Sequence, residues 1–152
     1  MRGMSLNGVQ LTGDGSIGER IASDGNFKAG FDVNRSVTQS STGNGFDGFR
    51  ALVVHHNTSV KNRRFGILIR SAGGAATGNI SSLKGLQGIS AANSTVIGNT
   101  VLSNLDTGIF VEGPSEVSDN TVGDNGGNSI GTVNFGCVMV NNAARPRARS
   151  PV

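Results

Sequence analysis

Short runs of apolar residues recur along the chain, and apolar and polar residues alternate within each run. Gly-Phe or Gly-Ile pairs open five of these runs, and Ser129-Ile130 continues the series. The pairs begin at Gly30, Gly48, Gly66, Gly88 and Gly108. The successive intervals, including the step to Ser129, are 18, 18, 22, 20 and 21 residues. Because such alternation is typical of a strand with one buried face, each run predicts a short strand.

Asparagine supplies a second marker with the same period. Asn57, Asn79, Asn99 and Asn120 are separated by 22, 20 and 21 residues, and each precedes another apolar position. Two markers that drift together predict a structural repeat of about 20 residues. We expect these four asparagines to occupy a sharp bend with left-handed φ and to form a structural ladder of hydrogen bonds.

The repeat predicts an all-β solenoid in which each coil holds three short strands. One coil cannot bury its own apolar face, so successive coils must stack. Glycine before each inward residue is expected to accommodate the remaining bends. A Gly-rich antiparallel sandwich is the rival fold, but it does not predict the same residue types at a fixed phase.

The repeat also predicts the organisation of the chain. Residues 1–12 are predicted to lead into the solenoid, residues 13–142 to form it, and residues 143–152 to be a disordered basic tail. The sequence contains no amphipathic helical segment that could cap an end of the stack. Uncapped coils expose strand edges that can pair, so we expect self-association through open coil ends.

The sequence Asn99-Thr100-Val101, followed by Asn104 and by Gly108-Ile109-Phe110-Val111, resembles a known repeat. It is similar to the right-handed parallel β-helix repeat of the pectin-lyase-like superfamily, which includes carbohydrate-binding and sugar-hydrolase repeats. The resemblance is good over about residues 48–140. It implies a single-stranded right-handed parallel β-helix of about six short coils. It also implies a secreted or cell-surface location, although no signal peptide is visible.

The resemblance further implies that substrate lies along one exterior sheet. If the Gly-Ile strands form that sheet, the outward column is expected to contain Asp32, Arg50, Leu68, Ser90, Phe110 and Gly131. Arg70, Lys61, Arg63, Arg64, Asp47, Asp106 and Glu112 would border it. Arginine can pair with sugar carboxylates, and an aromatic ring can stack on a sugar face. The predicted substrate-binding residues are therefore Asp32, Arg50, Arg70 and Phe110.

The functional hypothesis is a polysaccharide-binding β-helix module, extended to lyase-like or hydrolase-like processing. The alternative is a non-catalytic structural or assembly segment, such as part of an adhesin or phage spike, or a truncated β-helix fragment. The Asn-Thr-Asp, paired Asp and Gly-His-Gly elements of polygalacturonases are absent, as is the Asp-Pro-His element of alginate epimerases. No catalytic residue is assigned, and the sequence leaves open whether the protein is an enzyme.

The charge and the apolar content of the chain give little support for a nucleic acid or a membrane as a partner. The net charge is +3, but Arg145, Arg147 and Arg149 lie in the last eight residues, and without them 10 basic residues face 10 acidic ones. With no basic stripe and no interleaved stacking aromatics, we expect no nucleic-acid partner. No stretch approaches the 18 or more apolar residues of a membrane span, so no membrane partner is expected either.

No metal site or cofactor is expected. Adjacent residues on a strand point to opposite faces, so His55 and His56 are expected to be poor partners for one metal. Calcium is the ion for which the sequence offers a partial motif, because Thr42–Phe49 resembles one calcium-binding nonapeptide repeat. Such sites need tandem copies to complete the ligand shell, and no second copy follows.

Overall fold

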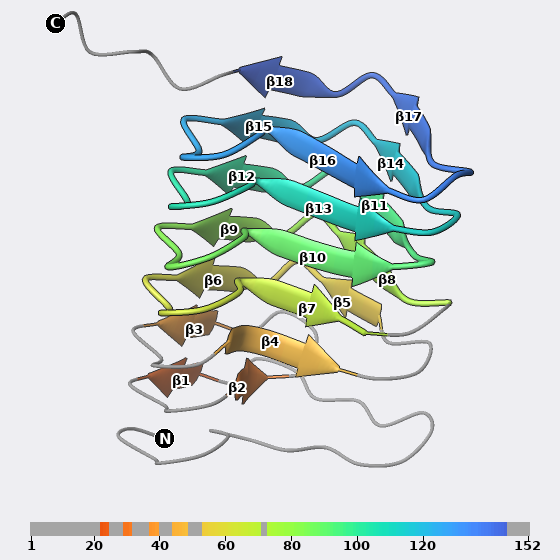
Figure 1. The fold of residues 1–152 in the computed structure, drawn as a ribbon. Coiled ribbons are helices and arrows are strands. Elements are labelled where there is room, and N and C mark those ends of the chain that lie inside the picture. Colours follow the sequence, from red (N-terminus) through yellow and green to blue (C-terminus); the bar gives the residue numbers. More distant parts are fainter. Residues whose placement is uncertain are drawn as a thin grey trace, which may run out of the picture.

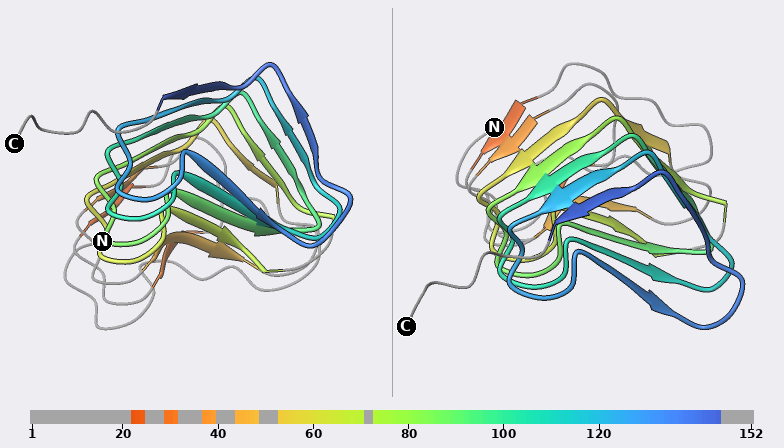
Figure 2. Two further views of the ribbon diagram at one scale, coloured as in Figure 1. Left: turned by 45° about the horizontal axis from the view of Figure 1, so that its top comes forward. Right: turned by 90° about the horizontal axis from the view of Figure 1, so that it is seen from above.

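The computed structural model describes residues 22–24, 29–31, 37–39, 44–48, 53–70 and 73–145. Within this part of the chain, strands of three to five residues wind into a stack of about four turns (Figure 1). Seen from above, successive coils have a similar outline, and each is displaced from the one before (Figure 2). The described residues contain no helix with the length and apolar character needed to cross a membrane.

The strands form three parallel sheets, which we call A, B and C. Sheet A contains β1 (Ala22–Asp24), β3 (Val37–Gln39), β6 (Thr58–Val60), β9 (Ile80–Ser82), β12 (Thr100–Leu102), β15 (Thr121–Gly123) and β18 (Ala143–Arg145). Sheet B contains β2 (Ala29–Phe31), β4 (Asn44–Gly48), β7 (Ile67–Ile69), β10 (Ile89–Ala92), β13 (Ile109–Glu112) and β16 (Ile130–Val133). Sheet C contains β5 (Val53–His55), β8 (Ala75–Thr77), β11 (Thr95–Ile97), β14 (Glu116–Ser118) and β17 (Val138–Val140).

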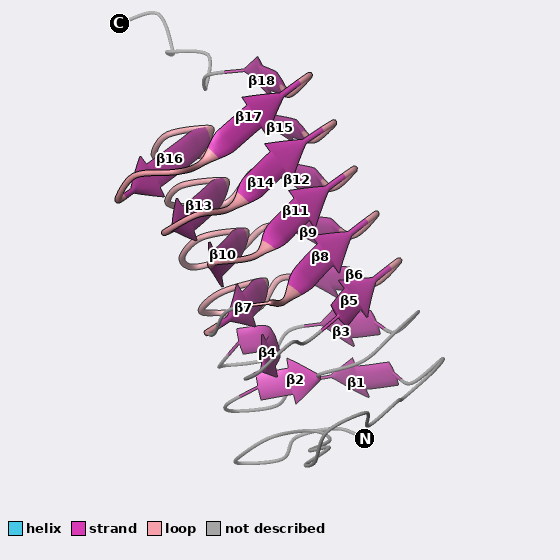
Figure 3. Ribbon diagram, turned by 90° about the vertical axis from the view of Figure 1, so that its right-hand side faces the viewer, coloured by secondary structure: helices cyan, strands magenta, loops and turns pink. Residues whose placement is uncertain are grey.

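Each strand pairs with the equivalent strand of the next coil. Ile67, Ile89, Ile109 and Ile130 are level with one another across sheet B, although 22, 20 and 21 residues separate them. The uneven spacing is therefore absorbed in the turns that connect the stacked strands, which are seen from the side in Figure 3. The predicted all-β class and the parallel stacking of three-strand coils are confirmed.

The core is one continuous file of inward side chains. Its fully buried members include Val54, Ala76, Val96 and Val117, which occupy one column of sheet C. Among the described residues Phe46 is the largest buried side chain, and it lies level with Ile67. Burying an aliphatic or aromatic side chain of this size contributes about 1.5–3 kcal/mol, so stacking, rather than any single coil, stabilises the fold.

The glycines that open the strands of sheet B have a different role from the predicted one. Gly66, Gly88 and Gly108 are absent from the residues with left-handed φ. A Cβ at Gly88 or Gly108 would instead overlap the side chain of Val101 or Val122, respectively. These glycines are needed because the chain passes against the interior side chains of the stack, and not because it bends there.

The solenoid continues past the expected boundary at residue 142. Strand β18 pairs with β15 over Ala143–Arg145 and adds a further rung to sheet A. The rest of the expected basic tail, residues 146–152, and the expected leading segment, residues 1–12, lie outside the described residues.

Candidate functional site

The outer face of sheet B carries the column in which substrate binding was expected. Leu68, Ser90, Phe110 and Gly131 occupy one register across β7, β10, β13 and β16. Leu68, Ser90 and Phe110 are half-buried, whereas the residues on either side of each are buried. Phe110 thus lies on the outer face of β13, two coils from Leu68.

One position of the expected column is occupied by a residue that was expected to border it. The pairing of β4 with β7 places Asp47 level with Leu68. The sequence contains two Gly-Phe pairs three residues apart, and the inward residue is Phe46 of the first pair. Arg50 itself, like Asp32, lies outside the described residues.

Four cationic residues cluster on the coil that contains β7, which we call the basic coil (residues 61–70). Lys61, Arg63 and Arg64 are exposed in the turn before β7, and Arg70 is exposed directly after it. The turn is held to the next coil by backbone hydrogen bonds, from Gly85 N–H to the Asn62 carbonyl and from Leu86 N–H to the Arg64 carbonyl. The cations therefore flank both ends of one strand on a fixed backbone.

Further along the axis the same side of the stack becomes acidic. Asp106 lies in the turn before β13, where its Oδ2 accepts a hydrogen bond of 3.3 Å from Gln87 Nε2. Glu112 is exposed at the end of β13, and its Oε1 lies 3.5 Å from Asn134 Nδ2. Two of the predicted binding residues are described: Arg70 directly follows β7, Phe110 lies on β13, and β10 lies between these two strands of sheet B. Their role in substrate binding remains a prediction.

The asparagine ladder runs along the corner between sheets C and A. Nδ2 of Asn57, Asn79 and Asn99 donates to Oδ1 of the next ladder asparagine at 3.2, 2.9 and 2.9 Å, respectively. The ladder continues from Asn120 to Asn142 at 2.9 Å. Asn57, Asn79, Asn99 and Asn120 are each 1% exposed, so these hydrogen bonds are made away from water. Each of these asparagine side chains has hydrogen-bond partners and joins two coils. The stability of the corner therefore depends strongly on the amide groups of the ladder.

The left-handed bend lies one residue before each ladder position, contrary to expectation. At these preceding positions His56, Gly78, Gly98, Asp119 and Asn141 have φ values between 52° and 65°. Asparagine recurs at the following position because its side chain spans two coils, and not because the backbone is strained there.

A second inward column follows five residues after the first and was not predicted. It contains Asn62, Lys84, Asn104 and Asn125, each no more than 2% exposed. Asn104 Nδ2 donates to Asn125 Oδ1 at 2.9 Å, and the Lys84 backbone N–H donates to Asn104 Oδ1 at 3.1 Å. The recurring Asn-x4-Asn spacing at 57/62, 99/104 and 120/125 was the available signal.

Lys84 interrupts this column. Its Nζ is buried and has no hydrogen-bond partner among the described residues. Burial lowers the pKa of Lys84 from 10.5 to about 6, since the charged form loses its hydration inside the stack. At neutral pH the side chain is therefore mainly an uncharged amine within the solenoid.

The histidine pair does not have the geometry expected of two adjacent strand residues. His56 leaves β5 with a φ of 55°, so the two rings turn toward each other. Their Nδ1 atoms lie 3.1 Å apart, and the rings meet edge to face. In the described part of the chain, no group of three or more His, Cys, Asp or Glu residues has the geometry to hold a metal ion.

Comparison with solved structures identifies modules of the same architecture. The A-module of the Azotobacter vinelandii mannuronan C-5 epimerase AlgE6 matches with a TM-score of 0.63 and 14% identity, covering 97% of this chain and 52% of that one. The A-module of the AlgE4 epimerase matches with a TM-score of 0.53 and 11% identity, covering 84% of this chain and 54% of that one. The chain has the parallel β-helix fold of these modules.

This result confirms, for the fold, the resemblance to pectin-lyase-like β-helices. The chain spans about half the length of the epimerase modules. No family model and no curated protein matches the sequence.

Proposed function

We propose that this protein binds an anionic, uronate-type polysaccharide along the outer face of sheet B. The observation that carries the proposal is the basic coil, where Lys61, Arg63, Arg64 and Arg70 are exposed at the two ends of β7. The right-handed winding and the count of about six coils, both implied by the resemblance, belong to the same proposal.

The arrangement suits a charged polymer. A guanidinium group donates two parallel hydrogen bonds to a carboxylate, and such charge-assisted contacts are about twice as strong as neutral ones. Strands about 4.8 Å apart present a rigid row of side chains, which a regular chain can follow over several coils. Ser90 offers a hydroxyl next to Leu68, and Phe110 offers an apolar surface for a sugar ring.

The similarity in fold is consistent with this substrate class. The two A-modules of the same architecture are named as epimerases of mannuronan. Processing of the bound polysaccharide would go beyond binding, because it would require a group that transfers a proton next to the uronate carboxylate. The basic coil supports binding alone.

Calorimetric titration with polymannuronate, with a neutral glucan as reference, tests the proposal. We expect binding of the acidic polymer alone, and a loss of about tenfold in affinity for Arg63→Ala and for Arg70→Ala, because each removes a charge-assisted contact. Arg145→Ala is the matched control, since Arg145 is also exposed but lies on β18 of sheet A. Failure of the wild-type protein to bind, or equal losses in Arg70→Ala and Arg145→Ala, would overturn the proposal.

A non-catalytic structural or assembly role is the second candidate. The specific observation in its favour is the exposed apolar surface of the last described coil. In that case the protein would bind no polysaccharide, and product analysis after incubation with polymannuronate would detect neither cleavage nor epimerisation.

A further inference from the structure

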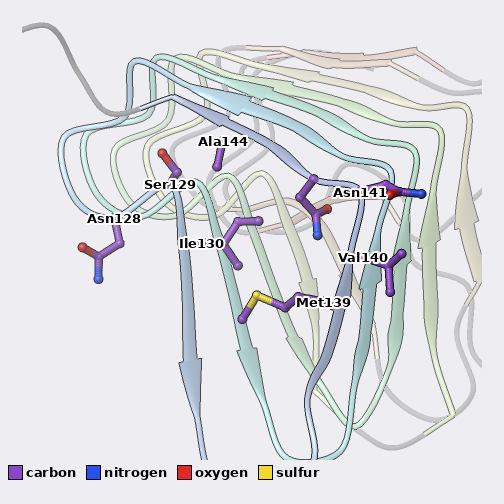
Figure 4. Close-up of a pocket in the computed structure, with 8 residues that line it drawn as sticks. Asn128, Ser129, Ile130, Met139, Val140, Asn141 and Ala144 are labelled. Atoms are coloured by element: carbon purple, nitrogen blue, oxygen red, sulfur yellow. The ribbon is translucent and has the colours of Figure 1, made fainter.

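The corner between sheets C and A repeats a pair of adjacent residues along the stack. Each pair consists of the last residue of a sheet C strand and the left-handed residue that follows it. Figure 4 shows one such pair, Val140 and Asn141, which point away from Met139 and Ile130. In chain order the described pairs are His55 with His56, Thr77 with Gly78, Ile97 with Gly98, Ser118 with Asp119, and Val140 with Asn141. In the first of these pairs, two imidazole rings therefore meet at one corner.

The two histidine rings bring ligand atoms of the same kind together. Nδ1 of His55 lies 3.1 Å from Nδ1 of His56. When both neutral rings carry their proton on Nε2, both Nδ1 lone pairs are available to one ion. With metal–nitrogen bonds of about 2.0–2.1 Å, two nitrogens at this separation enclose an angle of about 95–100° at the metal. This angle is near the right angle between neighbouring ligands of a tetragonal or octahedral ion.

Contacts within the stack hold both histidines in place. The His56 N–H donates to the Thr77 carbonyl at 3.0 Å, and the His55 carbonyl accepts from Asn57 Nδ2 at 3.0 Å. A Cβ on Gly78 would lie 3.0 Å from Cδ2 and 3.1 Å from Nε2 of His56, so this ring packs directly over the glycine. His55 is half-buried and His56 is exposed, which leaves the pair open to an ion from solvent. The backbone is therefore pre-organised, and this lowers the entropic cost of binding.

We propose that His55 and His56 bind one divalent transition-metal ion through their two Nδ1 atoms. Imidazole nitrogen suits late first-row ions such as Ni²⁺, Cu²⁺ and Zn²⁺, whereas Mg²⁺ and Ca²⁺ prefer oxygen. The described ranges hold no group of three or more His, Cys, Asp or Glu residues placed to bind a metal, so water completes the coordination. The pair follows β5 of sheet C, and the proposal does not rest on polysaccharide binding to sheet B.

Calorimetric titration with nickel chloride tests the proposal, with magnesium chloride as the reference salt. We expect one Ni²⁺ per chain and no Mg²⁺ binding at this pair. His55→Asn and His56→Asn should each lose about tenfold or more in affinity for Ni²⁺, because the chain no longer supplies the second ligand at high effective concentration. Asparagine tolerates left-handed φ, so His56→Asn retains the bend.

Asp119→Asn is the matched control for His56→Asn. It introduces the same residue at the same exposed, left-handed corner position, three coils further along, and should leave the affinity for Ni²⁺ unchanged. A wild-type protein that does not bind Ni²⁺ would overturn the proposal. Equal affinities of the wild type, His55→Asn and His56→Asn would do the same.

Urea denaturation with and without Ni²⁺ shows whether the fold assembles the site. A ligand that binds the folded state more tightly than the unfolded state raises stability. We therefore expect Ni²⁺ to raise the urea midpoint of the wild type and of Asp119→Asn, but not that of His56→Asn. An unchanged midpoint in wild-type protein that binds Ni²⁺ would contradict the proposal, because two adjacent histidines of an unfolded chain would then bind the ion equally well.

Discussion

The coils of β12 and β15 differ from those of β6 and β9 at the same interior positions. Val101 and Val122 are level with Ser81 and Ser59, and all four side chains are fully buried. The valines need only apolar neighbours. Each serine hydroxyl donates instead to the carbonyl of the glycine seven residues later, at 2.9 Å for Ser59 and 2.7 Å for Ser81.

The second inward column also differs between the earlier and the later coils. In the later coils Asn104 and Asn125 join through their side chains, whereas in the earlier coils Lys84 stands between Asn62 and Asn104 with its amine unpartnered among the described residues. The backbone register is the same in both halves. Stacking thus tolerates a change of side chain at an inward position. The cost in stability arises in the coil that contains the changed residue.

The largest effect should come from breaking the ladder in its regular part. Asn99→Ala removes a side chain whose Nδ2 donates to the carbonyls of Ala76 and Ile97 and to Asn120 Oδ1, and whose Oδ1 accepts from Asn79. Buried groups left without partners cost about 1–3 kcal/mol each, so we expect a loss of about 3–5 kcal/mol in the free energy of unfolding. Urea denaturation followed by circular dichroism measures it.

The control for this substitution is Asn128→Ala. Asn128 is exposed in the turn before β16, and the same chemical change there should alter the free energy of unfolding by less than about 0.5 kcal/mol. Equal losses at Asn99 and Asn128 would mean that the ladder does not hold the coils together.

Lys84 should make the stability of the protein depend on pH. Its pKa is about 6 in the fold and ordinarily 10.5, so between these values the unfolded chain holds a proton that the folded chain lacks. The free energy of unfolding should therefore rise with pH by up to about 1.4 kcal/mol per unit across this window, and this contribution should level off outside it. Urea midpoints measured between about pH 7 and about pH 9 would show the rise.

Two variants isolate the contribution of Lys84. Lys84→Met should be more stable than the wild type at neutral pH and should lose the slope, because the chain no longer contains a buried amine. Lys61→Met removes an exposed lysine and should retain the slope. A slope that survives Lys84→Met would assign the pH dependence to another group.

The smallest effect is expected when an earlier coil is made to match a later one. Ser81→Val gives β9 the residue that β12 has at the same register, and Gly66 leaves room for it as Gly88 does for Val101. The Gly88 carbonyl keeps its hydrogen bond from Ile67 N–H at 3.0 Å. We expect a change within about 1 kcal/mol by urea denaturation, and a loss of several times that would show that the two coils are not equivalent.

The sequence was sufficient to predict the repeat, but not to predict which residue points inward in every coil. The spacing of Asn57, Asn79, Asn99 and Asn120 predicts which residues share a corner, because a solenoid repeats its contacts every coil. It could not choose between Phe46 and Phe49, since both follow glycine and both suit an inward position.

Two other features depend on three-dimensional contacts that spacing does not contain. The burial of Lys84 follows from its position level with Asn104, whereas a lysine in a sequence is normally assigned to the surface. The proximity of the His55 and His56 rings depends on one left-handed residue at the end of β5.

The titration of Lys84 tests the stacked register most directly. Nuclear magnetic resonance of protein labelled with ¹³C at the lysine Cε positions reports the protonation of each amine, and Lys84→Met identifies the signal. If the coil of Lys84 stacks between those of Asn62 and Asn104, the pKa of that signal is about 6. A pKa near the ordinary 10.5 would place the side chain in water and would contradict the register of the whole stack.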